Sequence, residues 1–282
     1  MPTLNVIAMT ITVTPLGAQY EAVAAWIGEP VEDVRRQVED DHEEERDHWL
    51  AWRDGGVVGV LHPWRAPDRR LRLFFERTDP AAYGPLLEKV EGPCVTTIDE
   101  ADREAVAALA GLGFEIVRRE AQLEIPVTRT SFAVPAGYRL ISAADTGIRE
   151  LMALDDALRD DVPGAEGWET NETSFREETY DSPYFDPQAY LVAVDADGSY
   201  AGLVRVWNGP RPLPRLGLIG VLRDHRRRGL ARALISAAFN VLHDRGATVV
   251  TAEADETNTA SLTLLASFGA AEVGAEVELF RR

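Results

Sequence analysis

The sequence predicts an α/β fold in which two copies of one module follow each other, each a mixed, mostly antiparallel sheet flanked by helices. Three observations predict it. Two short motifs of the first half recur, in the same order, in the second half of this 282-residue chain. Short apolar runs alternate with stretches of 3.6-residue periodicity, which indicates strands and helices in turn. Apolar residues make up 45% of the chain, enough for a buried core in each copy.

The first repeated motif is a predicted β-hairpin. Residues 49–64 and 190–207 each contain an Asp-Gly turn, a second glycine and a tryptophan at identical spacing, with an offset of 143 residues. The matching residues are Asp54, Gly55, Gly59 and Trp64 in the first half, and Asp197, Gly198, Gly202 and Trp207 in the second. Asp-Gly between apolar runs predicts a hairpin, and the second glycine indicates a bulge or a close backbone approach.

The second repeated motif is the end of a helix. Residues 108–114 resemble residues 265–270, and in each copy an apolar helix stops at a glycine before further strands. The offset here is 156 residues, so the first copy is 13 residues shorter between its tryptophan and this glycine. The polar, proline-containing segment 128–137 is typical of a linker. We therefore predict two domains, at 1–128 and 137–282.

The same signals give the order of elements in the second domain. Strands are expected at 138–142, 189–194, 200–207, 215–221, 247–253 and 272–280. Helices are expected at 143–158, 229–243 and 259–268. The acidic segment between the first helix and the second strand is expected to be irregular, with some helix.

A basic turn joins the strand 215–221 to the helix 229–243. This turn contains four arginines, in a chain whose formal net charge is −18. They are Arg223, Arg226, Arg227 and Arg228. Gly229 opens the helix, whose first backbone N–H groups have no partner within the helix and bind anions, and a glycine lets a phosphate approach closely. The junction predicts a diphosphate site; the alternative is a plain basic turn between strand and helix.

Composition argues against several other classes of protein. The acidic excess disfavours nucleic acids and anionic membrane surfaces as partners, because their phosphates need neutralising charge. Five scattered histidines and the lone Cys94 have no metal-ligand spacing, so we expect no metal. A single thiol fits a reducing compartment, and we find no signal peptide or membrane-spanning run. We expect a cytoplasmic protein, either a monomer or a homodimer.

The arginine-rich junction resembles the acetyl-coenzyme A signature of the GNAT superfamily of N-acetyltransferases. The resemblance lies in a strand ending at Val221, then Arg-x-x-Gly-x-Ala at Arg226, Gly229 and Ala231, then an amphipathic helix. The following strand and the helix after Asn258 also resemble that family. The likeness covers most of the second domain and, more weakly, the later two thirds of the first. The layout is similar to that of tandem GNAT enzymes such as mycothiol synthase.

The resemblance implies an acetyl-CoA-dependent acetyltransferase and assigns roles to its residues. Main-chain groups of Val221, Leu222 and Arg223 would pair with the pantetheine arm, and an N–H near Val221 would polarise the thioester carbonyl. Backbone amides would hold the pyrophosphate at Arg226, Arg227, Arg228, Gly229, Leu230 and Ala231. Asn258 would either bond the pantetheine or cap its own helix, and both roles stay open.

The catalytic groups are less well defined. The family often has a tyrosine, the acid for the leaving thiolate, where this chain has Leu265. Tyr184 and Tyr180 are candidate acids only through proximity in sequence to the acceptor-side loops, and loop packing is the alternative. Glu253 ends a strand beside the expected thioester and is the candidate base, directly or through a water. A surface carboxylate is the alternative for Glu253.

The first domain has no such motif in its matching stretch, 72–80. Asp79 and Pro80 stand at the helix start there, and a carboxylate would repel a diphosphate. We predict a degenerate domain without a cofactor site, which either shapes the acceptor pocket or stabilises the second domain. Its acidic run 39–47 is expected to lie on an exposed helical face.

The acceptor is only broadly indicated. Residues 155–181 contain ten acidic and two basic residues, and in the family this region covers the acceptor. A negative cleft would attract a cationic amine, such as a polyamine, aminoglycoside, amino sugar or peptide amine, although the whole chain is acidic. We expect a small-molecule amine as acceptor. The alternative is a non-catalytic GNAT-fold module that binds CoA or a small molecule, which the missing tyrosine motivates.

Overall fold

The computed structural model describes residues 10–40, 48–165, 167–209 and 212–282. These residues form two compact units: the chain up to Val117 together with 277–282, and residues 118–276. Each unit by itself has mixed, mostly antiparallel strands with helices packed on them, which confirms the predicted α/β fold. The domains 1–128 and 137–282 were predicted from a repeat in the sequence. The contacts that define the two units do not test the boundary between these domains, so it stays a prediction.

Unit 1 contains two helical layers on one run of strands. Its strand order is β1-β2-β3-β4-β5, with the last part of β12 (Ala271–Arg281) beyond β5. The strands are β1 (Thr12–Pro15), β2 (Trp49–Arg53), β3 (Gly56–Arg65), β4 (Leu71–Glu76) and β5 (Cys94–Asp99). The helices are α1 (Tyr20–Ile27), α2 (Val31–Asp40), η2 (Pro80–Ala82), α3 (Tyr83–Leu87) and α4 (Arg103–Gly111). Of the predicted acidic helical run 39–47, residues 41–47 lie outside the described residues.

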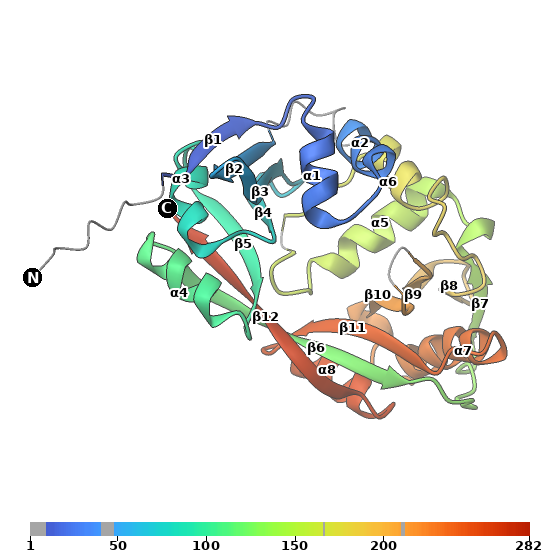
Figure 1. Cartoon of the computed structure of the whole chain (residues 1–282). Helices are drawn as coiled ribbons and strands as arrows, with labels where there is room; N and C mark the ends of the chain where they lie inside the picture. The colour runs from blue at the N-terminus through green and yellow to red at the C-terminus, as the bar shows by residue number, and fades with distance from the viewer. Residues whose placement is uncertain (1–9, 41–47, 166, 210–211) are drawn as a thin grey trace, which may run out of the picture. The chain divides into compact units, whose positions relative to one another are not determined.

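Unit 2 has the strand order β12-β6-β11-β10-β9-β8-β7, and Figure 1 shows β12 in red beside β6 in green. Its strands are β6 (Glu115–Pro126), β7 (Tyr138–Ser142), β8 (Tyr190–Asp195), β9 (Tyr200–Trp207), β10 (Arg215–Val221) and β11 (Val249–Asp255). Its helices are η3 (Ala143–Asp145), α5 (Ile148–Arg159), α6 (Glu172–Glu178), η4 (Arg223–His225), α7 (Leu230–Asp244) and α8 (Thr259–Ala266). Every predicted strand and helix of this region is present, most with ends within two residues.

The two repeated hairpins have the same irregularity. In β2–β3, Ala51 pairs with Gly59 and the register then shifts. In β8–β9, Ala193 pairs with Gly202 and the register shifts at the same place. A Cβ on Gly202 would lie 2.5 Å from the Gly220 carbonyl oxygen, so the close backbone approach expected for this glycine is present. The repeat seen in the sequence is therefore a repeat of structure.

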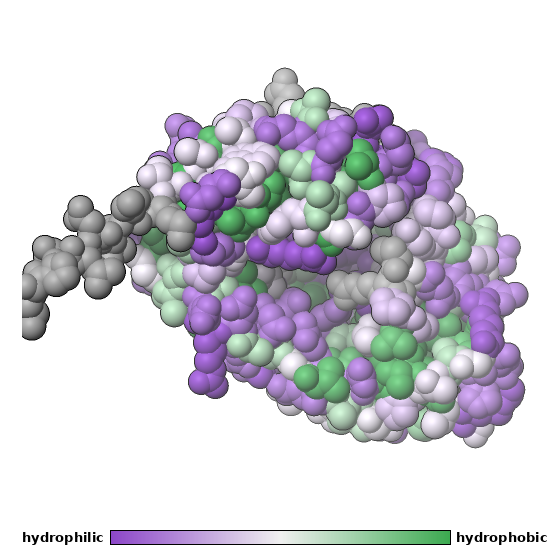
Figure 2. All heavy atoms as spheres, in the orientation of Figure 1, coloured by the Kyte–Doolittle hydropathy of each residue, from purple (hydrophilic) through white to green (hydrophobic). Residues whose placement is uncertain are grey.

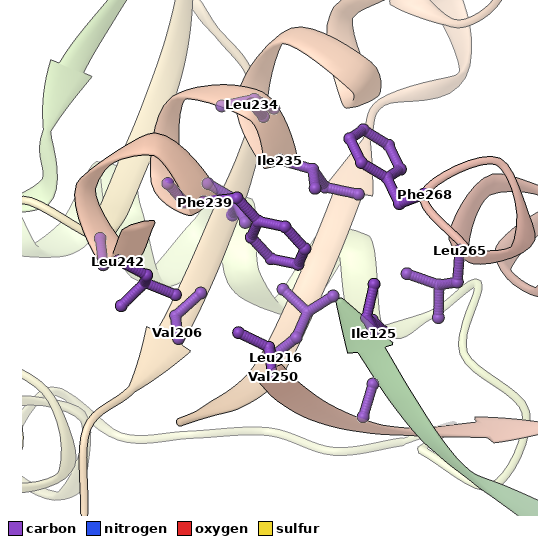
Figure 3. Packing of buried hydrophobic residues seen from close by; sticks show 14 of the residues in the cluster. Ile125, Val206, Leu216, Leu234, Ile235, Phe239, Leu242, Val250, Leu265 and Phe268 are labelled. Carbon is purple, nitrogen blue, oxygen red and sulfur yellow. The ribbon is translucent and has the colours of Figure 1, made fainter. Parts of the chain in front are cut away.

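The core of unit 2 fixes α7 against the sheet. Figure 3 shows Leu234, Ile235 and Phe239 of α7 packed onto β9, β10, β11 and β6, with Phe268 after α8 at their side. The spacing of these side chains follows the helical period predicted from the sequence. Since α7 is held along its length, its first turn stays at the end of β10.

The visible surface is mostly hydrophilic (Figure 2). Figure 2 shows hydrophilic residues spread over the visible face, with apolar residues gathered in smaller patches. In the described part of the chain, we find no helix that is long and apolar enough to cross a membrane.

A histidine pair in unit 1 predicts acid sensitivity. His62 on β3 contacts the buried His48 through their Nδ1 atoms, and burial, with the charge of His48 second, lowers the pKa of His62 from 6.5 to about 4. Between these values the unfolded chain binds the proton and the folded chain does not, so stability falls as pH falls. We expect a loss of up to about 3 kcal/mol from pH 7 to pH 4. Urea unfolding of His62→Gln should show a shallower pH dependence, and equal slopes would contradict this.

Candidate functional site

The candidate site begins where β10 ends at Val221. Two residues after η4 adopt left-handed backbone conformations, Arg227 with φ 60° and Gly229 with φ 86°. Gly229 is the N-cap of α7, and no side chain of the described residues caps the helix. The first bond of α7 runs from the Ala233 N–H to the Gly229 oxygen over 3.1 Å, so the preceding amides have no acceptor within the helix. The structure places an uncapped helix start where the sequence predicts a diphosphate site, and that site stays a prediction.

The two central strands of unit 2 separate beside this helix start. β10 pairs with β11 in parallel at one described register position, Arg215 with Thr251, although both strands continue. On its other side β10 pairs with β9 up to Val221. The Leu222 N–H donates to the Ala201 oxygen over 2.9 Å, so it is used by the sheet. Because backbone groups alternate along a strand, the Val221 N–H points to the side of β11, where the strands have separated.

Two arginines of the turn, Arg223 and Arg226, donate hydrogen bonds within the unit. Arg223 Nη2 donates to Asp161 Oδ1 over 2.5 Å, and Arg226 Nη2 donates to the other oxygen of the same carboxylate. Arg226 also donates from Nε to the Val221 oxygen over 2.8 Å. Arg223 first, and Arg226 second, hold the pKa of Asp161 below its usual value. The Asp161 carboxylate thus forms ion pairs with two of the four arginines that were predicted to face a diphosphate.

Glu253 lies on the face of β11 that points away from α7. Its neighbours Ala252 and Ala254 are buried in the core under α7 and α8, so the alternation of a strand puts Glu253 on the opposite face. Glu253 Oε2 accepts a hydrogen bond from Arg215 Nε over 2.7 Å. The structure therefore places the candidate base on β11 beyond the last residue that pairs with β10, opposite the open edge of that strand.

The structure separates Tyr184 from the other candidate residues. Its ring lies against Gly209 and lines a cavity of about 660 Å³ with Leu242 and Arg245, at the far end of α7 from Gly229. A helix of 15 residues spans roughly 22 Å, so this ring does not reach the junction. Tyr184 is therefore a loop-packing residue here, the alternative considered for it.

Two further sequence candidates have clear structural places. Asn258 Oδ1 accepts from the Ser261 N–H over 3.0 Å and caps α8, which supports the capping role for this residue. Leu265 is 1% exposed and belongs to the core under α7, so the position where the family often has tyrosine is an interior one. Tyr180, the other tyrosine considered, shares a hydrogen bond of 2.9 Å with the Thr146 hydroxyl.

A buried ion pair beside the site was not predicted. Arg205 on β9 is 7% exposed, and its Nη1 donates to Asp155 Oδ1 of α5 over 2.9 Å. The guanidinium lies 5.1 Å from the centre of the Trp207 ring. A Cβ on Gly217, where β10 bulges, would meet Trp207. The signal available in the sequence is an arginine inside the otherwise apolar strand 200–207.

Comparisons with known proteins agree with this geometry. The sequence model of the acetyltransferase (GNAT) family matches residues 152–270. A mycothiol acetyltransferase of Salinispora arenicola is 31% identical over 235 residues, which covers 80% of this chain and 73% of that protein. A second, from Thermobispora bispora, is 30% identical over 179 residues, with 60% and 59% covered.

Solved structures show the same fold over nearly the whole chain. A GCN5-related N-acetyltransferase from Sphaerobacter thermophilus has a TM-score of 0.67 at 18% identity, with 96% of this chain and 95% of that one covered. A tandem GNAT protein from the clavulanic acid biosynthesis pathway has a TM-score of 0.66 at 17% identity, with 96% and 98% covered. At these identities the likeness establishes the fold.

The fold and the junction define a class of protein: an α/β chain with an uncapped helix start beside two separated strands. The chain belongs to the GNAT acetyltransferase family. It is an acetyl-CoA-dependent N-acetyltransferase with two tandem GNAT-like domains. The arginine-glycine motif that suggested the family lies within the matched region, at the end of β10 and the start of α7.

Proposed function

We propose that the chain transfers the acetyl group of acetyl-CoA to the primary amine of a small molecule, by direct attack within a ternary complex. One observation carries the proposal. The open edge of β10, the two left-handed residues and the uncapped start of α7 form one continuous segment, residues 217–231. A strand edge suits the amide-bearing pantetheine arm, and a helix start suits a diphosphate.

The diphosphate would be held mainly by backbone amides. Arg227 and Gly229 are left-handed, and such residues would turn nearby N–H groups toward one side as a concave anion site. No atom lies within 4 Å of the Cβ position of Gly229, so the space in front of the helix start is open. The requirement for glycine here comes from its positive φ. Arg226, Arg227 and Arg228 would add charge to the site.

The acyl group would lie between β10 and β11. The Val221 N–H is directed to that side and supports its role as the donor to the thioester oxygen, where negative charge develops. The Leu222 N–H, in contrast, is used by Ala201, so pairing with pantetheine would rest on the other main-chain groups.

Glu253 would take a proton from the attacking ammonium, directly or through a water, while Arg215 positions the carboxylate. The amine nitrogen then attacks the thioester carbonyl carbon. A C–N bond forms, the C–S bond breaks, coenzyme A leaves as the thiolate, and the second proton lost from the nitrogen passes to that thiolate or to water. A thiolate is a fair leaving group, which is compatible with a buried leucine at position 265.

The acceptor would be a small molecule of the kind on which proteins named mycothiol acetyltransferase act, because two such relatives are 31% and 30% identical to this chain over 235 and 179 residues. The acidic segment 155–181 supports a cationic acceptor less strongly than its composition suggests. Asp155 is buried in an ion pair, and Asp161 is engaged by two arginines. Neither carboxylate is available to attract an amine in this state.

The direct test is a thermal-shift measurement with acetyl-CoA, followed by release of free thiol in the presence of a panel of amines. Stabilisation together with amine-dependent thiol release is the expected result. Stabilisation without thiol release on any amine would favour the non-catalytic alternative. No stabilisation by acetyl-CoA would contradict both.

Glu253→Gln tests the proposed base. The amide has the same shape but cannot take the proton, so we expect kcat to fall by roughly a hundredfold while the KM for acetyl-CoA stays unchanged. Glu256→Gln is the matched control, since that exposed carboxylate lies in the turn after β11 and pairs only loosely with Arg119, at 4.0 Å. If Glu253→Gln has the same kcat as Glu256→Gln, Glu253 is a surface carboxylate and not the base.

A further inference from the structure

Two contacts of the described residues 161–164 attach the first part of the α5–α6 loop to the rest of the unit. Asp161, just after α5, contacts Arg223 and Arg226 of the proposed donor site. Two residues further on, the Pro163 oxygen accepts from Arg118 Nη1 over 3.3 Å, and a Cβ on Gly164 would lie 2.6 Å from the Arg118 guanidinium carbon.

The second attachment lies on the face that carries the proposed base. Arg118 of β6 is 3.9 Å from Asp255 Oδ2, and Asp255 points to the same face of β11 as Glu253, two residues away. The loop therefore runs from the donor site to the acceptor side of the sheet.

The chemistry of the first attachment is that of the predicted ligand. A carboxylate with two oxygens engages two guanidinium groups, as a diphosphate would. Asp161 is 27% exposed on its side chain, and it is neither buried in a core nor part of a helix. Its replacement by a stronger anion therefore requires no unfolding.

We propose that Asp161 is a built-in competitor of the acetyl-CoA diphosphate, so that donor binding displaces it and releases the α5–α6 loop on the acceptor side. The proposal rests on the proposed function, since it needs a donor diphosphate at Arg223 and Arg226. It makes acetyl-CoA the first substrate to bind. It also explains why a carboxylate lies against the arginine-rich turn that is proposed to bind an anion.

Asp161→Asn tests the competition, with coenzyme A as the probe in isothermal titration of the full chain. Removal of the carboxylate should tighten coenzyme A binding by about three- to tenfold, because exposed ion pairs contribute modestly. Asp160→Asn is the matched control: it makes the same charge change one residue earlier, where the carboxylate acts on Arg223 only as a nearby charge and not through an ion pair in the described structure. We expect it to change the affinity by less than twofold.

The same variants give a second readout. Without ligand, Asp161→Asn should have a slightly lower melting temperature, because two arginines lose their partner, yet coenzyme A should raise that temperature by more than in the wild type. Equal or weaker coenzyme A binding by Asp161→Asn, relative to Asp160→Asn, would overturn the competition and leave the donor site intact. If no variant and no wild-type protein binds coenzyme A, the donor site itself is wrong, and the competition fails with it.

Discussion

Gly229→Asp is expected to abolish acetyl-CoA binding. The new carboxylate would lie at the start of α7, where it would accept from the amides that are proposed to hold the diphosphate and would repel the phosphates. The loss of two or more charge-assisted hydrogen bonds corresponds to an affinity at least about a hundredfold weaker. Isothermal titration with acetyl-CoA measures it directly.

The fold should survive this substitution. No atom lies within 4 Å of the Cβ position, so the cost is the strain of a positive φ, which aspartate tolerates better than most residues. Gly229→Asn is the control, because it fills the same space and has the same backbone strain without a charge. We expect an intermediate affinity for it. Unchanged affinity in the aspartate variant, with native circular dichroism, would remove Gly229 and the start of α7 from the donor site.

The parts of the molecule that could be predicted are those formed by residues that are adjacent in the sequence. The strand, turn and helix around Gly229 are adjacent in the chain, so turn residues, helical period and the strand limits 215–221 fix the local geometry. The Asp-Gly hairpins were predictable for the same reason, and even their bulges recur.

The parts that could not be predicted depend on contacts between distant residues. Nothing local indicates that Asp161 meets Arg226, or that β12 contributes residues to both units. Tyr184 shows the converse: closeness in sequence to the acceptor-side loops suggested a place at the site, whereas the chain carries this ring to the other end of α7. The spacing of residues along the chain predicts local conformation, but it does not predict which distant residues come into contact.

Asp155 illustrates how a structural contact changes the meaning of composition. In the sequence it is one of ten acids in a segment expected to attract the acceptor. In the structure it is 1% exposed and accepts from Arg205 over 2.9 Å and from Arg159 at its other oxygen. Its charge is therefore balanced within the layer between α5 and β9, and its role is to hold that layer together.

Asp155→Leu is accordingly expected to destabilise the protein by about 3 to 5 kcal/mol, since it leaves the buried Arg205 guanidinium without its carboxylate, beside a second guanidinium. Urea unfolding followed by tryptophan fluorescence measures the loss. A lost hydrogen bond alone would cost only about 1 kcal/mol, so the size of the effect distinguishes an uncompensated charge from a missing contact.

The double variant Asp155→Leu/Arg205→Met decides between these causes. If the cost comes from the buried charge, removal of Arg205 as well should restore most of the stability, because two apolar side chains replace a pair whose desolvation already offsets its attraction. Arg159, which is 21% exposed on its side chain, can turn to solvent in this background. Losses that simply add in the double variant would show that Asp155 and Arg205 act independently. In that case α5 is held on β9 by its apolar residues, and the ion pair is incidental.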